Sequence, residues 1–242
     1  MGGDTMNIKH LAAIVAVALA IAGCSESTDP SSEPTMTMTA RMTSTTAAPS
    51  AIRPDSPRTE GGRLIDSVRV DKVRILLSRI KLHRTNDDTS NGGKDVKIGP
   101  AVLTIDNDTV TTVFASAIPT GTYERMKLEK HKFSGSEAAQ YAADPVFGPF
   151  AFPDRITLIV DGTVYAEGET RAFTLTDDRT ENLWVGFDPA LTVTESTSTT
   201  VDLEFSARLL FNVDGNILDP LDVSLRDVIR ARLKNAFKLK KR

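Results

Sequence analysis

Apolar and mostly polar residues alternate along residues 201–213. The apolar members are Val201, Leu203, Phe205, Ala207, Leu209, Phe211 and Val213. Successive side chains of a strand point to opposite faces, so this alternation predicts one continuous strand with one face in a core. We therefore expect Phe205 and Leu209 to be buried and Glu204, on the opposite face, to be exposed.

Shorter runs rich in Val, Ile and Leu recur between clusters of turn residues. They cover residues 64–70, 73–82, 96–98, 102–105, 110–115, 123–132, 171–175 and 183–187. The apolar phase changes near Leu77, which indicates a bulge. Asp161-Gly162 is a pair typical of tight turns and predicts a hairpin over residues 156–167. Residues 134–154 are predicted to form a long excursion between strands, which contains a short helical turn. Many short strands at close spacing predict a mainly β fold, a single antiparallel β-sandwich.

The last segment has helical periodicity. Ser224 and Asp227 fit a capping box, and apolar residues recur every four positions from Leu225 to Phe237. We expect an amphipathic helix over residues 224–239. Residues 228–242 contain seven basic and no acidic side chains, whereas residues 61–227 contain 18 basic and 26 acidic ones. The helix could bind anionic lipid or an acidic partner. We favour docking on its own domain, which leaves the basic tail from Lys238 exposed to anionic envelope polymers.

The N-terminus has the organisation of a secretory signal. A basic segment around Lys9 precedes an apolar run from Leu11 to Ala22, which is too short to cross a ~30 Å hydrocarbon core. Gly23 and Cys24 follow, and the pattern resembles the lipobox of bacterial lipoprotein precursors. The resemblance implies a signal peptide over residues 1–23, lipidation of Cys24, the only cysteine, and an outer-membrane location, because Ser25 replaces the aspartate of inner-membrane lipoproteins.

The chain after Cys24 divides into two parts. Residues 24–60 are polar and rich in Ser, Thr and Pro, so we expect an acylated, disordered tether. Residues 61–242 then form the β-sandwich domain with its terminal helix. Three segments, at 65–83, 118–123 and 218–222, resemble an uncharacterised family of bacterial lipoproteins with an immunoglobulin- or transthyretin-like sandwich. That resemblance implies a fold and no catalytic residue.

No familiar catalytic motif occurs in the sequence. His83 and His131 could converge as metal ligands, although ordinary strand histidines are commoner. The oxygen donors Asp214, Asn216 and Asp219 loosely suggest a calcium loop, but calcium takes six to eight oxygens and a turn explains the same residues. We expect no metal and no cofactor.

Candidates for binding are few. Trp184 alternates with Leu183 and Val185 on a predicted strand, where it could stack on a sugar ring or be covered by its neighbours. The basic residues Lys238, Lys240 and Lys241 could bind an anionic polymer or a protein partner. A net charge of −3 gives no reason to expect nucleic acid.

These patterns predict a non-catalytic outer-membrane lipoprotein, which acts as a binding or structural module of the cell envelope. Two alternatives stay open. One is an envelope hydrolase with carboxylates contributed by separate strands, which leave no local motif. The other is a carrier of a small apolar ligand between the sheets.

Overall fold

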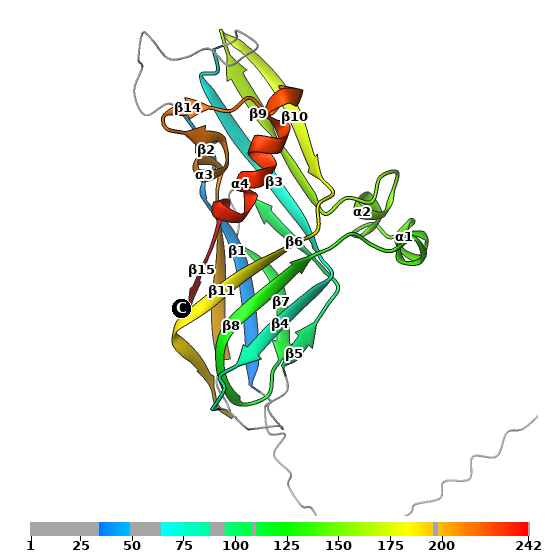
Figure 1. Cartoon of the computed structure of the whole chain (residues 1–242), viewed down its shortest axis with the longest axis vertical. Helices are drawn as coiled ribbons and strands as arrows, with labels where there is room; N and C mark the ends of the chain where they lie inside the picture. The colour runs from blue at the N-terminus through cyan, green and yellow to red at the C-terminus, as the bar shows by residue number, and fades with distance from the viewer. Residues whose placement is uncertain (1–33, 49–63, 88–94, 108–109, 196–197, 242) are drawn as a thin grey trace, which may run out of the picture. The chain divides into compact units, whose positions relative to one another are not determined.

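Three β-sheets form the body of the protein (Figure 1). The structure is a computed structural model, and it describes residues 34–48, 64–87, 95–107, 110–195 and 198–241. The predicted signal peptide and Cys24 lie outside these residues. The mainly β, largely antiparallel fold predicted from the sequence is confirmed.

The strands of each sheet follow in spatial order. Sheet A contains β15 (Phe237–Lys241), β12 (Ser198–Ser206), β1 (Thr35–Ser44) and β7 (Thr111–Ala117). Sheet B contains β10 (Glu169–Asp177), β9 (Leu158–Ala166), β3 (Ser67–Leu77) and β2 (Thr46–Ala47), and β6 (Ala101–Asp106) also pairs with β3. Sheet C contains β11 (Glu181–Val193), β8 (Gly121–Lys130), β4 (Arg79–Arg84) and β5 (Val96–Ile98).

The remaining elements are short. A two-stranded hairpin joins β13 (Asn212–Val213) to β14 (Asn216–Ile217). The helices are α1 (Gly135–Tyr141), α2 (Gly148–Ala151), α3 (Ala207–Phe211), η2 (Val223–Leu225) and α4 (Arg226–Ala236). None of the helices in the described part of the chain has the length and apolar character needed to span a bilayer.

The predicted change of phase near Leu77 is a bend at Ser78, where the chain passes from sheet B into sheet C. Leu77, the last residue of β3, and Ile80, the second residue of β4, are both buried. The bend therefore allows both strands to face the common core, although their apolar phases differ by one residue.

The predicted tether over residues 24–60 is wrong for residues 34–48. β1 lies between β12 and β7 in sheet A and pairs with β12 in parallel. Met36, Met38 and Ala40 are fully buried, because Thr and Met alternate with the period of a strand. The low hydrophobicity of this segment hid that period. The predicted domain boundary at residue 61 therefore lies too late in the chain.

The predicted hairpin at Asp161-Gly162 is also wrong. β9 runs straight through both residues, and the chain turns at Glu167-Gly168, where both residues have positive φ (52° and 78°). Gly162 is instead a point of close approach, because a Cβ there would lie 2.2 Å from the carbonyl oxygen of Arg69. The glycine is needed for packing between strands rather than for a turn.

The predicted strand over residues 201–213 ends at Ser206. The Ser206 hydroxyl accepts a hydrogen bond from the Leu209 amide and caps α3. Leu210 is consequently buried and Leu209 is 37% exposed, the reverse of the strand prediction. Glu204 is buried as well, because the Arg41 guanidinium from the neighbouring β1 lies 2.5 Å from its carboxylate.

The predicted C-terminal helix is shorter than residues 224–239. It begins with η2, continues as α4 and ends at Ala236, after which the chain becomes β15 and pairs with β12. The expected docking of the helix is confirmed by the burial of Ile229 and Leu233. Arg232 strengthens this docking by donating hydrogen bonds to carbonyl groups of Leu209, Leu210 and Asn212.

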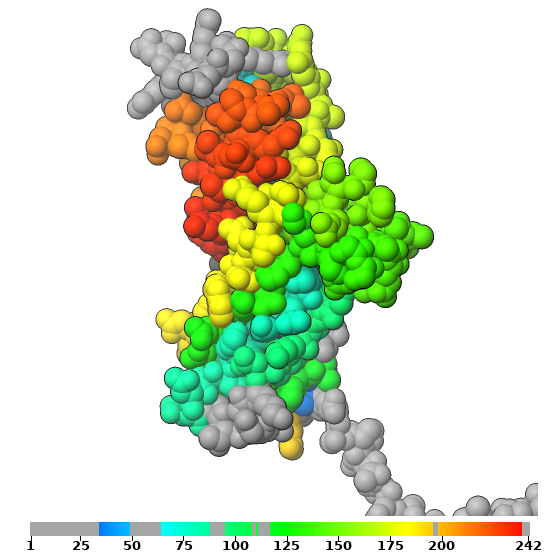
Figure 2. Space-filling view, turned by 45° about the vertical axis from the view of Figure 1, so that its right-hand side comes forward, coloured from blue at the N-terminus to red at the C-terminus, as the bar shows by residue number. Residues whose placement is uncertain are grey.

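The predicted excursion between β8 and β9 contains α1 and α2 and projects from the sheets (Figure 2). It packs on sheet B through a second hydrophobic cluster, which includes Leu76 of β3 and Ile159 of β9. Phe133, Tyr141 and Phe147 contact one another with ring centroids 4.8–5.9 Å apart, above the buried Phe150. Its outer surface carries Phe152, which is 60% exposed.

Candidate functional site

A cavity of about 250 Å³ opens between the edge of sheet C and the C-terminal elements. Strand β11 forms one wall, and the end of α4 with β15 forms the other, as Figure 2 shows where the yellow surface lies beside the red. We call this cavity the β11–β15 groove. Its apolar lining consists of Leu128, Leu183, Val185, Leu203 and Phe237. Its polar and aromatic lining consists of Asn182, Trp184, Lys234, Asn235 and Lys238.

The walls of the groove follow from local sequence. Leu183 on β11 is only 8% exposed, and the next residue, Trp184, faces outward and is 50% exposed. On the opposite wall, the chain changes from helix to strand at Phe237. The centroid of the Phe237 ring lies 5.2 Å from that of the Phe205 ring. The last turn of α4 then presents Lys234 at the groove, where a cation suits the negative end of the helix dipole.

Cationic side chains support the Trp184 ring from the β8 side. The guanidinium carbon of Arg125 lies 5.0 Å from the ring centroid, and Lys127 Nζ lies 5.3 Å from it. The His83 ring on β4 is tilted against the indole at a centroid distance of 5.2 Å. Such cation–π contacts attract the cation to the ring and fix the orientation of the indole.

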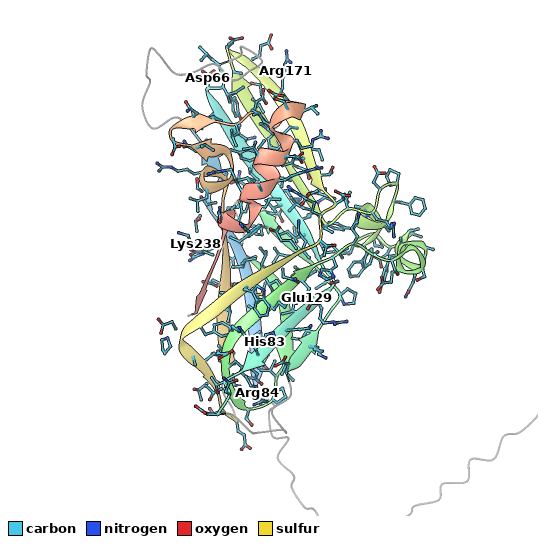
Figure 3. The ribbon with its side chains drawn as sticks, viewed as in Figure 1. Asp66, His83, Arg84, Glu129, Arg171 and Lys238 are labelled. Atoms are coloured by element: carbon cyan, nitrogen blue, oxygen red, sulfur yellow. The ribbon has the colours of Figure 1, made fainter. Side chains whose placement is uncertain are left out.

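Glu129, which is labelled in Figure 3, holds two lysines of this face in place. Its carboxylate lies 2.7 Å from Lys81 Nζ and 2.9 Å from Lys127 Nζ. Burial of the carboxyl group raises its pKa, but the hydrogen bonds and charges of the two lysines outweigh that effect and lower the pKa to about 2. Glu129 is therefore ionised at neutral pH and orients Lys127 beneath Trp184.

His83, considered from the sequence as a possible metal ligand, has other contacts in the structure. Its Nδ1 lies 3.0 Å from Asp95 Oδ2, and its Nε2 is buried with no hydrogen-bond partner in the described chain. His131 lies just after β8, and no three potential metal ligands of the His, Cys, Asp and Glu types gather among the described residues. His83 instead contributes to the packing around Trp184.

The buried carboxylates outside this face have structural partners. Asp177 lies 2.6 Å from Lys130 Nζ and 3.5 Å from Arg230 Nε, and so connects sheet B to β8 and α4. Asp202 accepts a hydrogen bond from Thr39 across the β1–β12 pair. Neither carboxylate lines the β11–β15 groove.

Two predicted binding candidates, Trp184 and Lys238, line the same cavity although they come from different sheets. Figure 3 marks Lys238 on β15. The backbone register of β15 places Lys240 opposite Asp202 and Lys241 opposite Val201, while their side chains lie outside the described part.

The calcium candidates form turns. Asp214 and Gly215 have φ values of 51° and 90° and connect β13 to β14 tightly, so that Asn216 pairs with Val213. Asp219 Oδ1 accepts a hydrogen bond of 2.8 Å from the Leu221 amide. The turn interpretation therefore accounts for all three residues.

Sequence reasoning missed several residues of the site. Arg125 and Lys127 could have been found in part, because they alternate with apolar residues on the predicted strand over residues 123–132, but their proximity to Trp184 depends on the pairing of β8 with β11. Asn182 directly precedes the predicted strand over residues 183–187. Lys234 and Asn235 could not, because their position depends on where α4 ends and on which strand the C-terminus joins.

Comparison of the chain with models of known families, with curated proteins and with solved structures finds no match.

Proposed function

We propose that the chain is a lipid-anchored binding protein of the bacterial cell envelope, attached to the outer membrane through Cys24, and that it holds its ligand in the β11–β15 groove without chemical change. The observation that carries the proposal is the half-exposed Trp184 at a cavity that also contains two lysines. Aromatic surface beside a few convergent polar groups is typical of ligand-binding sites.

The free polar groups of the groove support binding. Neither Lys234 nor Lys238 forms an ion pair with any residue that the structure describes. Within the same residues the indole N–H of Trp184 has no hydrogen-bond acceptor. These donors are positioned by α4, β15 and β11, so a ligand would meet a largely preformed site.

The composition of the groove argues against the hydrolase alternative. A hydrolase of the glycosidase type needs two carboxylates about 5–10 Å apart at its cleft. The residues that line the groove include no carboxylate. The nearby Glu129 has a pKa of about 2 and is held by lysines, which makes it a poor proton donor at neutral pH.

The short segment between Cys24 and β1 supports a function close to the membrane. Ten residues separate Cys24 from the first residue of β1, Thr35. Even a fully extended segment of that length spans at most about 36 Å. Acylation of Cys24 would therefore keep the sheets close to the lipid surface, and the groove would meet ligands of that layer.

Cosedimentation with envelope material tests the binding function. Full-length protein in mild detergent is mixed with insoluble envelope glycan from a Gram-negative bacterium and centrifuged. We expect the wild-type protein to pellet with the glycan and Trp184→Ala to stay in the supernatant. Phe152→Ala removes another exposed aromatic ring, directly after α2, and should pellet like the wild type. Equal pelleting of all three proteins, or of none, contradicts the proposal.

The anchor needs a separate test. Cells that express the wild-type chain or Cys24→Ser are labelled with a palmitate analogue. Only the wild-type protein should carry the label and fractionate with the outer membrane. Labelling of the serine variant would overturn the assignment of Cys24 as the lipidated residue.

A further inference from the structure

We infer that the ligand of the β11–β15 groove is an acidic oligosaccharide, with one sugar ring stacked on Trp184 and its carboxylate or phosphate held by Lys234 and Lys238. This inference rests on the proposed binding function and adds the chemical class of the ligand. Three features of the groove carry it: the aromatic platform, the two asparagine amides and the unpaired positive charge.

The aromatic platform and the amides match the two kinds of surface on a sugar. The C–H face of a pyranose ring is apolar and suits the exposed part of the Trp184 indole. Sugar hydroxyls both donate and accept hydrogen bonds, and so do the side-chain amides of Asn182 and Asn235, which line the groove. The apolar floor beneath them, at Leu183 and Phe237, keeps these polar groups at the mouth of the groove.

The size of the groove fits one or two units of a longer chain. Its volume of about 250 Å³ is below the range of about 300–1,000 Å³ that encloses a whole drug-sized ligand. A polymer can place one or two of its units in the groove and leave the rest of its chain outside. A compact ligand that is larger than the groove could not be enclosed by it. The open edges of β11 and β15 along the groove provide the path for such a chain.

The charge of the groove favours an acidic ligand. Two lysines and no carboxylate line the cavity, although residues 61–227 carry more acidic than basic side chains. Arg125 and Lys127 lie on the far side of Trp184, but Glu124 and Glu129 pair with them, so the unpaired positive charge among the described residues here is that of Lys234 and Lys238. A neutral sugar would leave this charge unused, whereas a carboxylate or phosphate would gain charge-assisted hydrogen bonds from the lysines.

Other anionic macromolecules fit less well. Nucleic acid is bound by a continuous basic channel with several aromatic platforms, and Trp184 is the single strongly exposed aromatic residue among those lining the groove. An acidic peptide would satisfy the lysines and leave the indole face without a matching partner. A saccharide uses all three features together.

Calorimetry with paired ligands tests the inference. The full chain in mild detergent is titrated with hexagalacturonate, with its methyl ester, and with neutral and phosphorylated glucose hexamers. We expect the carboxylated or the phosphorylated hexamer to bind at least about tenfold more tightly than its uncharged counterpart at low ionic strength. The difference should shrink in 0.5 M salt, since salt screens exposed charges.

Variants assign the effect to residues. Trp184→Ala should abolish binding of charged and uncharged hexamers alike. The double substitution Lys234→Gln and Lys238→Gln should reduce the affinity for the acidic hexamer to that of its neutral counterpart. Lys72→Gln removes a lysine of sheet B, paired with Asp106 and outside the groove, and should change nothing. A thermal melt of each variant excludes loss of folding as the cause.

Each alternative outcome has a distinct meaning. Equal affinity for charged and neutral hexamers, or no effect of the double substitution, overturns the acidic ligand and leaves the binding function intact. Trp184-dependent binding of polyglutamate or a DNA oligonucleotide, without binding of any hexamer, overturns the saccharide class. Failure of every hexamer also overturns it, whereas failure to pellet with envelope glycan counts against the proposed function itself.

Discussion

At position 162 the backbone leaves no room for a methyl group. A Cβ on Gly162 would lie 2.2 Å from the carbonyl oxygen of Arg69 and 2.7 Å from the ring of Phe173. Strands β3, β9 and β10 meet at this point, so the substitution Gly162→Ala must push neighbouring strands apart.

We expect Gly162→Ala to lower the free energy of unfolding by at least about 1–3 kcal/mol, measured by urea denaturation. Gly186→Ala is the matched control, since an added Cβ there has no neighbour within 4 Å. It should change stability by no more than about 0.5 kcal/mol. Similar values for the two variants would mean that β9 does not pass through Gly162 as described.

Glu129 makes stability depend on pH. Its pKa of about 2 in the folded protein, against 4.5 for an ordinary glutamate, corresponds to about 3 kcal/mol of stabilisation at neutral pH. A lowered folded-state pKa stabilises the protein above the unfolded-state pKa. This contribution is therefore complete above about pH 5 and is lost as the pH falls from 4.5 towards 2.

Unfolding of the wild type and Glu129→Gln should be compared between pH 2 and pH 7. We expect the stability difference to be largest at pH 7 and to shrink below pH 4.5. Glu124→Gln changes a carboxylate on the same strand that is 38% exposed, and its effect should be small across the range. A difference between wild type and Glu129→Gln that does not vary with pH would contradict the proposed role of Lys81 and Lys127.

Among the elements, α3 provides the clearest choice between two structures. A strand through residues 207–211 would bury Leu209, whereas the helix buries Leu210 completely and leaves Leu209 37% exposed. We expect Leu210→Ala to cost about 2–5 kcal/mol and Leu209→Ala less than about 1 kcal/mol in chemical denaturation. A larger loss of stability for Leu209→Ala than for Leu210→Ala would contradict the helix and support a continuous strand.

Strand β1 should behave as part of the core. Met38 is fully buried at the centre of sheet A, so Met38→Ala should lower stability by about 2–5 kcal/mol. Thr46→Ala, at an exposed site on β2, should stay within about 0.5 kcal/mol of the wild type. Hydrogen exchange offers a second measurement, in which the amides of Met36 to Ala40 should be protected. Rapid exchange of those amides would contradict the assignment of β1 to sheet A and support the predicted tether.

Most strands could be predicted from the sequence because their period was read over strongly apolar residues. The failures have particular causes. In β1 the alternating residues are Thr and Met, which resemble a polar linker in composition. Ser206 caps a helix because the helical conformation buries Leu210 and Phe211 in the core. That preference depends on tertiary packing, which the local sequence does not show. Gly162 resembled a turn residue because close approach between strands has no sequence signal of its own.

The site was predicted in part for the same reason. The alternation in β11 shows Trp184 on the face opposite Leu183. The partnership of Trp184 with Lys238 was hidden, because it requires β15 to join sheet A beside the edge of sheet C. Such a contact is long-range and is set by the whole fold.

At the scale of the whole molecule, the proposed anchor at Cys24 would allow a reach of at most about 36 Å, and the groove lies between the edges of two sheets. The sequence supplies a direct reporter of that groove, because Trp184 is the only tryptophan in the chain. Its emission must respond to any ligand that covers the indole, and no other residue can produce the same signal.

The most direct measurement is therefore a titration of the full chain with acidic oligosaccharide, followed by tryptophan fluorescence. We predict a saturable shift of the Trp184 emission to shorter wavelength, together with protection of the indole from quenching by acrylamide. Lys72→Gln should leave the titration curve unchanged, and the Lys234→Gln and Lys238→Gln double variant should weaken it. Binding that calorimetry detects while the emission and the quenching of Trp184 stay constant would show that the ligand lies elsewhere, and would contradict the account.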